Sequence, residues 1–172
     1  NELNEEKTKK DGVIRNLEQI PGESAAAMLA KKDKLLFTNH KYNLYSNQYI
    51  PLSKNVDVEE RIKLQGLWDN SVGGGSIAHI NVTDSLTPEQ MENIILYAAQ
   101  KGVCYFAINM NTAKCCTCGK LYIGKFDKSP CHGAEVINFL RVVGFLSPVN
   151  SWIEVRRNEY KDRQFYFKNV FK

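Results

Sequence analysis

One segment restricts the fold of this chain more than any other. Residues 77–82 and residues 103–110 are mostly apolar runs of strand length. Between them, Thr87-Pro88-Glu89-Gln90 predicts a helix start with a capping box and a Pro at the first helical position, and Gly102 predicts the helix end. Two strands joined by a helix with short connections predict a βαβ unit, whose parallel strands are covered on both faces. Apolar residues recur along the predicted helix at helical spacing: Met91, Ile94, Ile95 and Ala98.

Two further helices are predicted by weaker signals. The Ala-rich segment that begins near Ser24 favours a short helix. Asp57 and Glu60 have the spacing of a helix cap and a residue that reaches back to it, which predicts a helix from Val58 to about Leu67. The sequence therefore indicates an α/β or α+β domain, in which residues 43–52 are a loop or an irregular strand and the C-terminal third is irregular.

The composition agrees with a folded domain and excludes several classes of protein. Of the 172 residues, 43% are hydrophobic and 24% are charged, which permits a packed core and leaves only residues 1–13 as a polar, solvent-facing lead-in. A net charge of +4 is too small to indicate binding to nucleic acid. No apolar run approaches the roughly 20 residues that a membrane span requires. We therefore expect neither a membrane nor a nucleic-acid partner.

The five cysteines indicate a metal site rather than disulfides. They are Cys104, Cys115, Cys116, Cys118 and Cys131. Three of them lie within four positions, where disulfides among them would be strained. The odd count without a secretory signal fits a reducing, cytoplasmic compartment. Cys104 stands apart in an apolar run, so we expect it to be a core thiol.

Cys115 and Cys118 have the C-x-x-C spacing of half a zinc knuckle, and the Gly that follows lets the backbone turn. Cys131 lies far enough along the chain to begin a second half, although a second C-x-x-C pair is missing. We therefore expect zinc bound by Cys115, Cys118 and Cys131. His132 is the first choice for the fourth ligand and Cys116 is the second. The alternative is that these are ordinary buried or surface thiols.

The segment RVVGFLSPV, residues 141–149, reads by composition as a strand with a bulge at Gly144. Its position after the cysteines and before Trp152 supports another interpretation. A knuckle followed by RVVGFL and then PV-x-x-W resembles the C-terminal region of the large subunit of anaerobic, class III ribonucleotide reductases. Further stretches resemble that family in the same order, and the resemblance covers residues 14–172: IPGESAAAMLAKKDK, LYSNQYIPL, RIKLQGLWD, GGGSIAHINV and GVCYFAIN.

Two alternatives compete with this resemblance. The RV-x-G-[YF] motif is shared with other glycyl-radical enzymes, such as pyruvate formate-lyase and its small spare-part proteins, whereas the cysteine knuckle and YSNQYIPL separate the reductase from them. The other alternative is a zinc-ribbon binding module in which RVVGFL is only a strand. A ribbon that binds nucleic acid should carry clustered basic residues near the knuckle, and GKLYIGKFDK is only modestly basic.

The resemblance implies a fold of the α/β class, namely the C-terminal part of the ten-stranded α/β barrel of glycyl-radical enzymes. On this basis residues 14–111 are a partial barrel segment, residues 112–135 the zinc-binding knuckle, and residues 136–172 the glycyl-radical loop and C-terminal tail. The regulatory nucleotide-binding cone and most of the barrel would lie outside this chain. We therefore expect the chain to be inactive by itself.

The resemblance also implies the chemistry of Gly144. Its α-carbon would hold a stable radical, installed by an iron–sulfur, S-adenosylmethionine-dependent activase, that generates a thiyl radical on a Cys outside this chain. The thiyl radical would then start the reduction of a ribonucleoside triphosphate. Glycine suits this role because a side chain would crowd the planar radical centre. We expect four apolar neighbours to bury the site: Val142, Val143, Phe145 and Leu146.

The implied partners are the N-terminal remainder of the large subunit, the activase, the nucleotide substrate and a second copy in a homodimer of the complete enzyme. Glu23 matches a Pro-x-Glu turn that the resemblance places near the substrate, as a general acid or base. It also fits a Glu in the first turn of a helix, where the dipole favours it. His40 and His79 are expected to be structural. The basic residues between 156 and 163 are expected to form a solvated face, with a docking surface for the activase as the alternative.

Overall fold

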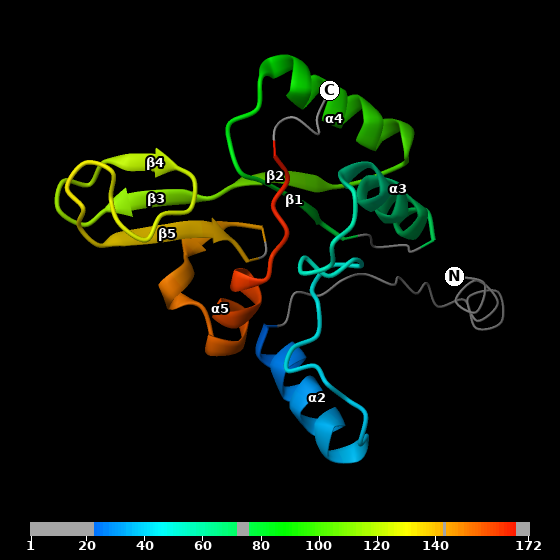
Figure 1. Ribbon diagram of the computed structural model, residues 1–172. Helices are drawn as coiled ribbons and strands as arrows, with labels where there is room; N and C mark the ends of the chain where they lie inside the picture. Colours follow the sequence, from blue (N-terminus) through cyan, green and yellow to red (C-terminus); the bar gives the residue numbers. More distant parts are fainter. Residues whose placement is uncertain (1–22, 72–75, 143, 168–172) are drawn as a thin grey trace.

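The computed structural model describes residues 23–71, 76–142 and 144–167 (Figure 1). In chain order its elements are α2 (Glu23–Leu36), α3 (Val58–Asp69), β1 (Ala78–Val82), α4 (Pro88–Gln100), β2 (Phe106–Met110), β3 (Thr112–Cys115), β4 (Leu121–Ile123), β5 (Val136–Arg141), β6 (Leu146–Pro148), the 3-10 helix η1 (Val149–Ser151) and α5 (Glu154–Lys161). Within these ranges, no helix has the length and apolar character needed to cross a membrane. The lead-in expected at residues 1–13 lies outside the described residues.

The predicted βαβ unit is confirmed. β1 and β2 pair in parallel, in a register that sets Ala78 opposite Phe106, and α4 connects them. The capping box of α4 is complete, because the Thr87 hydroxyl accepts from the Gln90 backbone N–H and the Gln90 side chain accepts from the Thr87 N–H. Gly102 follows the helix with a φ of 77°, a left-handed conformation that glycine adopts without strain.

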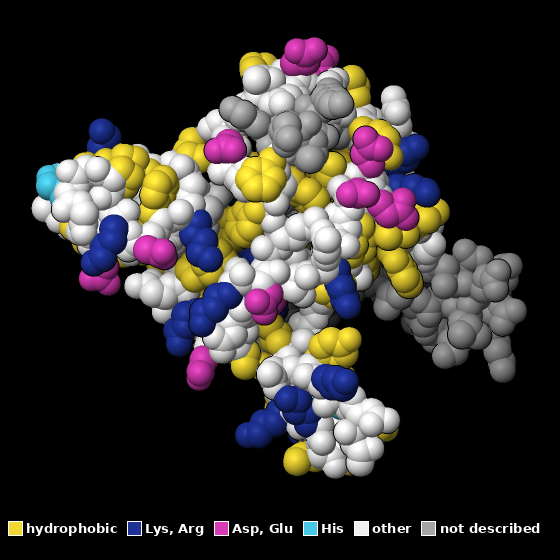
Figure 2. Space-filling view, in the orientation of Figure 1, with side chains coloured by type: hydrophobic (Ala, Val, Ile, Leu, Met, Phe, Trp, Pro, Cys, Tyr) yellow, Lys and Arg dark blue, Asp and Glu magenta, His cyan; other side chains and the backbone are white. Residues whose placement is uncertain are grey.

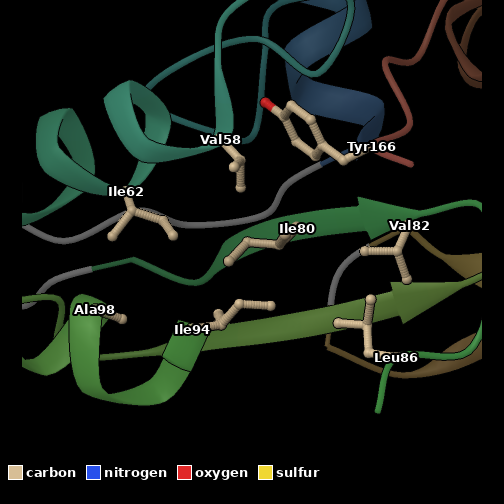
Figure 3. Packing of buried hydrophobic residues seen from close by; sticks show 8 residues of the cluster. All are labelled: Val58, Ile62, Ile80, Val82, Leu86, Ile94, Ala98 and Tyr166. Atoms are coloured by element: carbon tan, nitrogen blue, oxygen red, sulfur yellow. The ribbon is translucent and has the colours of Figure 1, made fainter. Parts of the chain in front are cut away.

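A hydrophobic core fills the space between β1, α3 and α4 (Figure 3). Every residue of β1 is buried, and Ile80 lies between the side chains of the two helices. Burying one such side chain stabilises the fold by about 1.5–3 kcal/mol. On α4, Ile94 and Ala98 face this core as predicted, whereas Met91 and Ile95 are exposed. The residues of the core cluster are Val58, Ile62, Ile80, Val82, Leu86, Ile94, Ala98 and Tyr166.

α3 begins at Val58 as predicted, but the predicted side-chain cap at its N-terminus does not form. The Asp57 side chain makes no capping hydrogen bond, so the expected capping box is wrong. The buried Arg61 side chain holds the region instead, since its guanidinium donates to the carbonyl oxygens of Ile50 (2.9 Å) and Lys54 (3.0 Å). These bonds tie the helix to residues 43–54, which form a loop in the described structure.

The C-terminal third is not irregular, contrary to the expectation from sequence. It contains a four-stranded antiparallel sheet in the order β4-β3-β5-β6, with α5 packed beside β5 (Figure 1). The sheet pairs segments that are far apart in sequence, such as Thr112 with Phe139. Strands this short carry little local signal, because their stability comes from cross-strand partners that sequence periodicity does not reveal.

The C-terminal segment returns to the βαβ unit and lies along β1. The Tyr166 backbone N–H donates to the Asn81 carbonyl (2.8 Å), and the Tyr166 carbonyl accepts from the Thr83 N–H (3.0 Å). A parallel bridge also joins Val82 to Tyr166. The two sheets are therefore connected through the chain that follows α5.

α2 projects away from the rest of the molecule (Figure 1). Figure 2 shows basic and hydrophobic side chains together on its surface. Its large exposed apolar residues are Met28, Leu29, Leu35 and Leu36. Such a surface is more apolar than a solvated helix requires.

Candidate glycine loop and metal centre

Cys115, Cys118, Cys131 and His132 lie together at one end of the four-stranded sheet, with their ligand atoms all within 4.8 Å of one another. Cys115 ends β3, Cys118 lies in the turn that follows, and the other two precede β5. The Sγ atoms of Cys118 and Cys131 are 3.6 Å apart. Nδ1 of His132 lies 3.0 Å from the Cys131 Sγ and 3.8 Å from the Cys115 Sγ.

This donor set fits zinc. Zn–S bonds of about 2.3 Å and Zn–N bonds of about 2.0–2.1 Å place tetrahedral ligand atoms roughly 3.5–3.8 Å apart. The Cys118–Cys131 and Cys115–His132 separations of 3.6 and 3.8 Å match this range, whereas the 3.0 Å between His132 and Cys131 is shorter. Three thiols and one imidazole form a common closed zinc site. The adjacent Cys131 and His132 both supply a ligand atom, so the site does not need a second C-x-x-C pair. Cys116, the other candidate for the fourth ligand, is exposed and lies outside this group.

The backbone around the four side chains turns at two glycines. Gly119 has a φ of 74° and Gly133 a φ of 60°, so each half of the knuckle ends in a left-handed residue. Ser129 supports the second half, because it is buried and its hydroxyl accepts from the backbone N–H of Ala134 (3.0 Å). Sequence reasoning missed Ser129, since a serine near cysteines carries no ligand signal of its own.

Neighbouring hydroxyls favour the thiolates of Cys115 and Cys131. The pKa of Cys118 is raised instead, because the hydrogen bond from the Lys120 backbone N–H is outweighed by burial and by the other two thiols. Hydrogen bonds from Ser129 and from the Cys118 backbone N–H lower the pKa of the Cys115 thiol to about 5. The Tyr122 hydroxyl lowers the pKa of Cys131, and the same bond raises the pKa of Tyr122 to about 12. Hydrogen bonding to Cys131 also raises the pKa of His132.

Cys104 is exposed, so the expectation of a core thiol is wrong. The strand begins only at Phe106, two residues later. The Cys104 backbone N–H donates to the Asp69 carboxylate (3.0 Å), which holds this residue in the connection before the strand. Its thiol lies outside the metal cluster.

Gly144 lies in the turn of a hairpin formed by β5 and β6. Arg141 pairs with Leu146 across the hairpin, and Gly144 is exposed between them. The strand with a bulge suggested by composition is therefore wrong, since β5 ends before the glycine. A Cβ built on Gly144 would meet no described atom within 4 Å. Among the described residues, no close contact requires glycine at this position.

The apolar neighbours of Gly144 bury the site only in part. Val142 is buried in a cluster with Leu140, whereas Phe145 is 66% exposed and Leu146 is 50% exposed. The expectation that these two residues cover the glycine is wrong for this chain, because both of them and Gly144 are exposed. Val143 lies outside the described residues.

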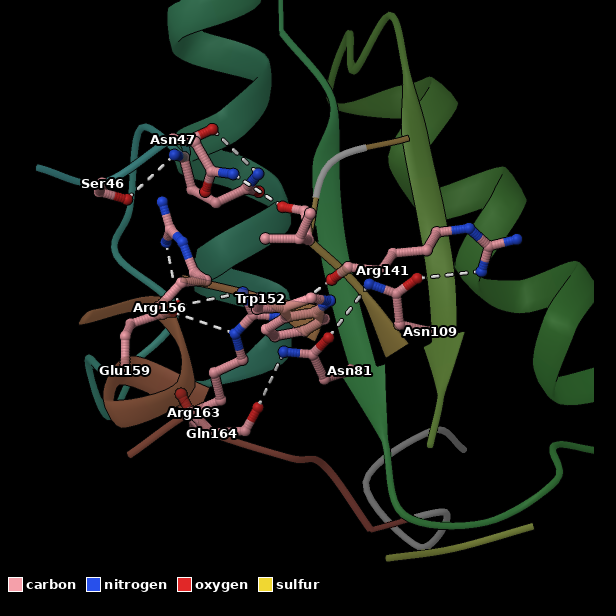
Figure 4. A network of polar contacts seen from close by, with 12 residues as sticks. Ser46, Asn47, Asn81, Asn109, Arg141, Trp152, Arg156, Glu159, Arg163 and Gln164 are labelled. Carbon is pink, nitrogen blue, oxygen red and sulfur yellow. Dashed lines mark hydrogen bonds and ion pairs between the residues drawn. The ribbon is translucent and has the colours of Figure 1, made fainter. Parts of the chain in front are cut away.

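Side chains from separate segments bind the backbone carbonyls around Gly144 (Figure 4). The Arg163 guanidinium donates to the Arg141 carbonyl (2.9 Å), and the Asn47 side-chain amide donates to the Val142 carbonyl (2.8 Å). The Arg141 side chain donates to the Gly144 carbonyl (3.3 Å) and to Oδ1 of Asn109 in β2 (3.1 Å). The glycine is thus exposed on a loop whose carbonyl groups are held in place.

Trp152 anchors the second strand of the hairpin. Its indole N–H donates to the Ser147 hydroxyl (2.7 Å), and its ring meets Tyr160 edge to face with centroids 5.8 Å apart. The Arg163 guanidinium lies 5.0 Å from the Trp152 ring centroid, within cation–π range. Trp152 and Tyr160 belong to the same buried cluster as Val142.

The basic residues between 156 and 163 form the expected solvated face only in part. Arg156 and Arg163 are 1% and 5% exposed, and both bind the carboxylate of Glu159 at 3.0 Å. A half-buried carboxylate between two buried guanidinium groups is a structural ion network, which the i,i+3 and i,i+4 spacing permits. Arg157 remains exposed, as predicted.

Buried hydrogen bonds connect the start of β3 and the loop after β4, at the end of the sheet opposite the cysteines, to α5. Asn111 precedes β3, and its side-chain amide donates to the Gly124 carbonyl (3.1 Å) and to Asn138 in β5 (3.0 Å). It accepts from the Tyr160 hydroxyl (2.6 Å). Because Tyr160 packs on Trp152, one helix fixes both the loop after β4 and the hairpin.

The remaining predicted residues lie elsewhere. Glu23 is the first residue of α2, which agrees with the expectation of a Glu in the first turn of a helix. Its side chain is not among those described. His79 is buried in β1, where the side chain of Gln48 accepts from its backbone N–H (2.9 Å). His40 contacts the rings of Tyr42 and Tyr45. Neither histidine lies in the metal cluster.

The sequence model of a family described as anaerobic ribonucleoside-triphosphate reductase matches residues 1–166. Similar solved structures are enzymes of the same kind. An anaerobic ribonucleotide reductase has 40% sequence identity and a TM-score of 0.83, over 96% of this chain and 27% of its own. The Thermotoga maritima enzyme with glycerol in the active site has 39% identity and a TM-score of 0.76, over 92% of this chain and 26% of its own.

The Thermotoga maritima enzyme in complex with dATP and CTP has 36% identity and a TM-score of 0.73, over 94% of this chain and 26% of its own. No curated protein matches this chain. The chain thus spans about a quarter of the length of the solved enzymes that it resembles, from 26% to 27%. The similarity includes both the βαβ unit and the C-terminal sheet, because it extends over nearly the whole chain.

Proposed function

This chain belongs to the anaerobic ribonucleoside-triphosphate reductase family, and we propose that it is the radical-bearing C-terminal portion of such an enzyme, which reduces ribonucleotides to deoxyribonucleotides. The observation that carries the proposal is the hairpin of Gly144, where an exposed glycine lies on a loop held by Asn47, Arg141 and Arg163. A zinc-ribbon module has no need of such a loop. A spare-part protein of the pyruvate formate-lyase type is disfavoured by the family match.

The chemistry proposed for Gly144 is the loss of one α-hydrogen atom to an iron–sulfur, S-adenosylmethionine-dependent activase. The unpaired electron would then be shared by the α-carbon, the amide nitrogen and the carbonyl group. A cysteine thiol outside this chain would return a hydrogen atom to Gly144 and become the thiyl radical that attacks the substrate. The open space around Gly144 gives both exchanges access to the α-carbon. The bound carbonyls keep that carbon in one place.

We propose that Cys115, Cys118, Cys131 and His132 hold structural zinc, supported by the mutual distances of their ligand atoms. Four protein ligands leave no position for a water molecule, so the metal would take no part in the reaction. It would fix the loop of residues 129–133 to the end of β3. Since β5 follows that loop and leads to Gly144, the metal would stabilise the approach to the hairpin.

Replacing Cys118 by Ser is expected to remove most of the metal, because a hydroxyl is a poor zinc ligand beside thiolates. Metal analysis of reduced, dialysed protein should give about one zinc per chain before the change and well under one after it. Hydrogen exchange should rise over residues 112–135. Cys104→Ser is the matched control, since Cys104 lies outside the cluster, and should keep the metal. Equal zinc content in the two variants would contradict the assignment.

Several partners are proposed with this function: the N-terminal remainder of the large subunit, the activase, a ribonucleoside triphosphate and a second copy of the complete enzyme. The exposed apolar residues near Gly144, Phe145 and Leu146, are the surface that we assign to contact with the remainder. The five cysteines are unpaired with one another, which supports a reducing, cytoplasmic compartment.

We also propose Glu23 as a general acid or base for the substrate hydroxyl groups, an assignment that rests on the Pro21-Gly22-Glu23 motif. In the assembled enzyme, Glu23→Gln should lower kcat while leaving the yield of radical unchanged. The comparison of radical content with turnover separates this role from a defect in activation. Unchanged turnover would leave Glu23 as an ordinary residue of the first helical turn.

The proposed function is tested by the sensitivity of the activated chain to air. A carbon radical on the backbone reacts with dioxygen, and the peptide chain then breaks at that residue. After anaerobic activation together with the rest of the enzyme, exposure to air should release a C-terminal peptide that begins after Gly144. Mass spectrometry identifies the cut. Cleavage at another residue, or equal cleavage without the activase, would contradict the proposal.

A further inference from the structure

We infer that Arg141 is a positioning residue for the radical. Its side chain fixes the plane of the peptide group after Gly144 and draws unpaired spin toward the Gly144 carbonyl. The inference rests on the proposed function, because it assumes that Gly144 carries the radical. It concerns a hydrogen bond that sequence reasoning did not anticipate. Arg141 is the last residue of β5, and its own side chain reaches forward to the carbonyl three residues later.

The geometry makes Arg141 a bridge between the hairpin and the βαβ unit. Its Nε donates to the Gly144 carbonyl (3.3 Å), while its Nη1 donates to Oδ1 of Asn109 (3.1 Å). Asn109 is fully buried in β2, and its amide donates to Oδ1 of Asn81 in β1 (3.2 Å). The guanidinium is therefore anchored to a buried pair of asparagines, and the planar fork of the guanidinium sets where Nε points.

The backbone of Arg141 is held as well as its side chain. Its carbonyl accepts from Nη1 of Arg163 (2.9 Å), and Arg163 is fixed by two bonds to the Glu159 carboxylate, 3.1 Å and 3.0 Å long. The next carbonyl, that of Val142, accepts from Asn47 (2.8 Å). Because the chain before Gly144 is held at two successive carbonyls, the direction of the Arg141 side chain is determined by the fold.

The charge of the donor gives this bond its chemical effect. A radical on a backbone α-carbon is stabilised when the amide nitrogen donates electron density and the carbonyl group accepts it, with both groups in one plane. A charged donor on the carbonyl oxygen strengthens the accepting side, and charge-assisted hydrogen bonds are about twice as strong as neutral ones. Arg141 would thus increase the share of spin on the carbonyl group and resist its rotation out of the plane.

A purely structural role for Arg141 makes different predictions. If the residue only closes the hairpin, its replacement loosens the loop but leaves the electronic structure of the radical unchanged. The discriminating measurement is therefore spectroscopic. Arg141→Met removes the donor and keeps an apolar stem, and Arg141→Lys keeps the charge without the planar fork. Arg157→Met is the matched control, because Arg157 is exposed on α5 and binds the carbonyls of Asn150 and Trp152 instead.

The first measurement uses the full chain without activation. Glycine labelled with ¹³C at the carbonyl gives a resonance for Gly144, which is identified by its absence in Gly144→Ala. In Arg141→Met this resonance should shift upfield, because the carbonyl no longer accepts a hydrogen bond. It should stay in place in Arg157→Met. An unshifted resonance in Arg141→Met would overturn the inference at this stage, independently of any radical.

The second measurement uses the complete reductase after anaerobic activation, with arginine labelled with ¹⁵N. Electron–nuclear double resonance should detect coupling to an arginine nitrogen in the unsubstituted enzyme. This measurement needs no variant, so it remains informative even if a variant fails to fold. The coupling should be lost in Arg141→Met and retained in Arg157→Met. At high field, the largest g value should rise in Arg141→Met, because a hydrogen bond to the carbonyl oxygen lowers it.

The outcomes separate the two proposals. No radical in the unsubstituted enzyme would reject the proposed function, and the role of Arg141 with it. A radical at Gly144 without arginine nitrogen coupling, or with the same g values in Arg141→Met, would overturn the inference and leave the proposed function intact. Loss of the arginine nitrogen coupling in Arg141→Met, together with a raised g value, would support both the proposed function and the role of Arg141.

Discussion

Replacing Gly144 by Ala is expected to abolish the radical completely while leaving the fold and the metal content unchanged. The added methyl group would crowd the planar centre, whereas in the resting chain it meets no described atom within 4 Å. The free energy of unfolding should therefore change by no more than about 0.5 kcal/mol, as for an ordinary surface substitution. Thermal unfolding, zinc analysis and electron paramagnetic resonance measure the three properties on one preparation.

The matched control for this variant is Asn150→Ala, at an exposed position of the 3-10 helix that follows the hairpin. It changes a neighbouring exposed residue without altering the glycine, so it should keep both the radical and the air-dependent cleavage. Undiminished radical in Gly144→Ala would show that another residue carries it. A large loss of stability in Gly144→Ala would mean that the glycine is needed for the hairpin itself.

Replacing Glu159 by Gln is expected to destabilise the chain strongly. The carboxylate of Glu159 lies between the buried guanidinium groups of Arg156 and Arg163, at 3.0 Å from each. Removing its charge leaves two buried cations without their anion, and breaking a buried pair in this way costs about 3–5 kcal/mol. The midpoint of chemical denaturation reports the loss. Because Arg163 also holds the Arg141 carbonyl, the hairpin should exchange its amide hydrogens faster.

Glu154→Gln is the control on the same helix. Glu154 is exposed in the first turn of α5, where a carboxylate contributes only about 0.3–1 kcal/mol through the helix dipole. The contrast between the two variants isolates the effect of the buried ion network from that of helix propensity. Equal losses of stability in the two variants would contradict the structural role given to Glu159.

Local sequence signals predicted the βαβ unit well. The capping box of Thr87 and Gln90 formed as expected, because both partners lie within one helical turn and need nothing from the rest of the fold. The equivalent pattern at Asp57 did not form a side-chain cap. There the helix start is bound by Arg61 and its contacts to the preceding loop, and such tertiary contacts override a local preference.

The environment of the polar residues could not be predicted in the same way. Asn47 reaches the Val142 carbonyl, 95 residues away in sequence, so no local pattern reveals the contact. Arg156 and Arg163 looked like solvated residues because basic residues usually are, and only the fold brings them to one half-buried carboxylate. Cys104 looked buried because its run is apolar, yet the strand begins after it.

The Cys/His cluster that could hold a metal was the most predictable part of the candidate site. The C-x-x-C spacing of Cys115 and Cys118 brings two thiols together by local geometry, so their proximity followed from sequence. The sequence did not decide between His132 and Cys116 as the fourth ligand, because each of them is adjacent to a cysteine of the cluster. It is the approach of residues 131–132 to β3 that places His132 with the three thiols.

The central claim is that Gly144 carries the radical, and isotope-edited electron paramagnetic resonance tests it most directly. The activated complete enzyme should give a doublet, because the unpaired electron couples to the one α-hydrogen that remains. Protein made with glycine deuterated at the α-carbon should give a signal in which the doublet has collapsed, and Gly144→Ala should give none. A doublet that persists with deuterated glycine, or that appears in Gly144→Ala, would contradict the account.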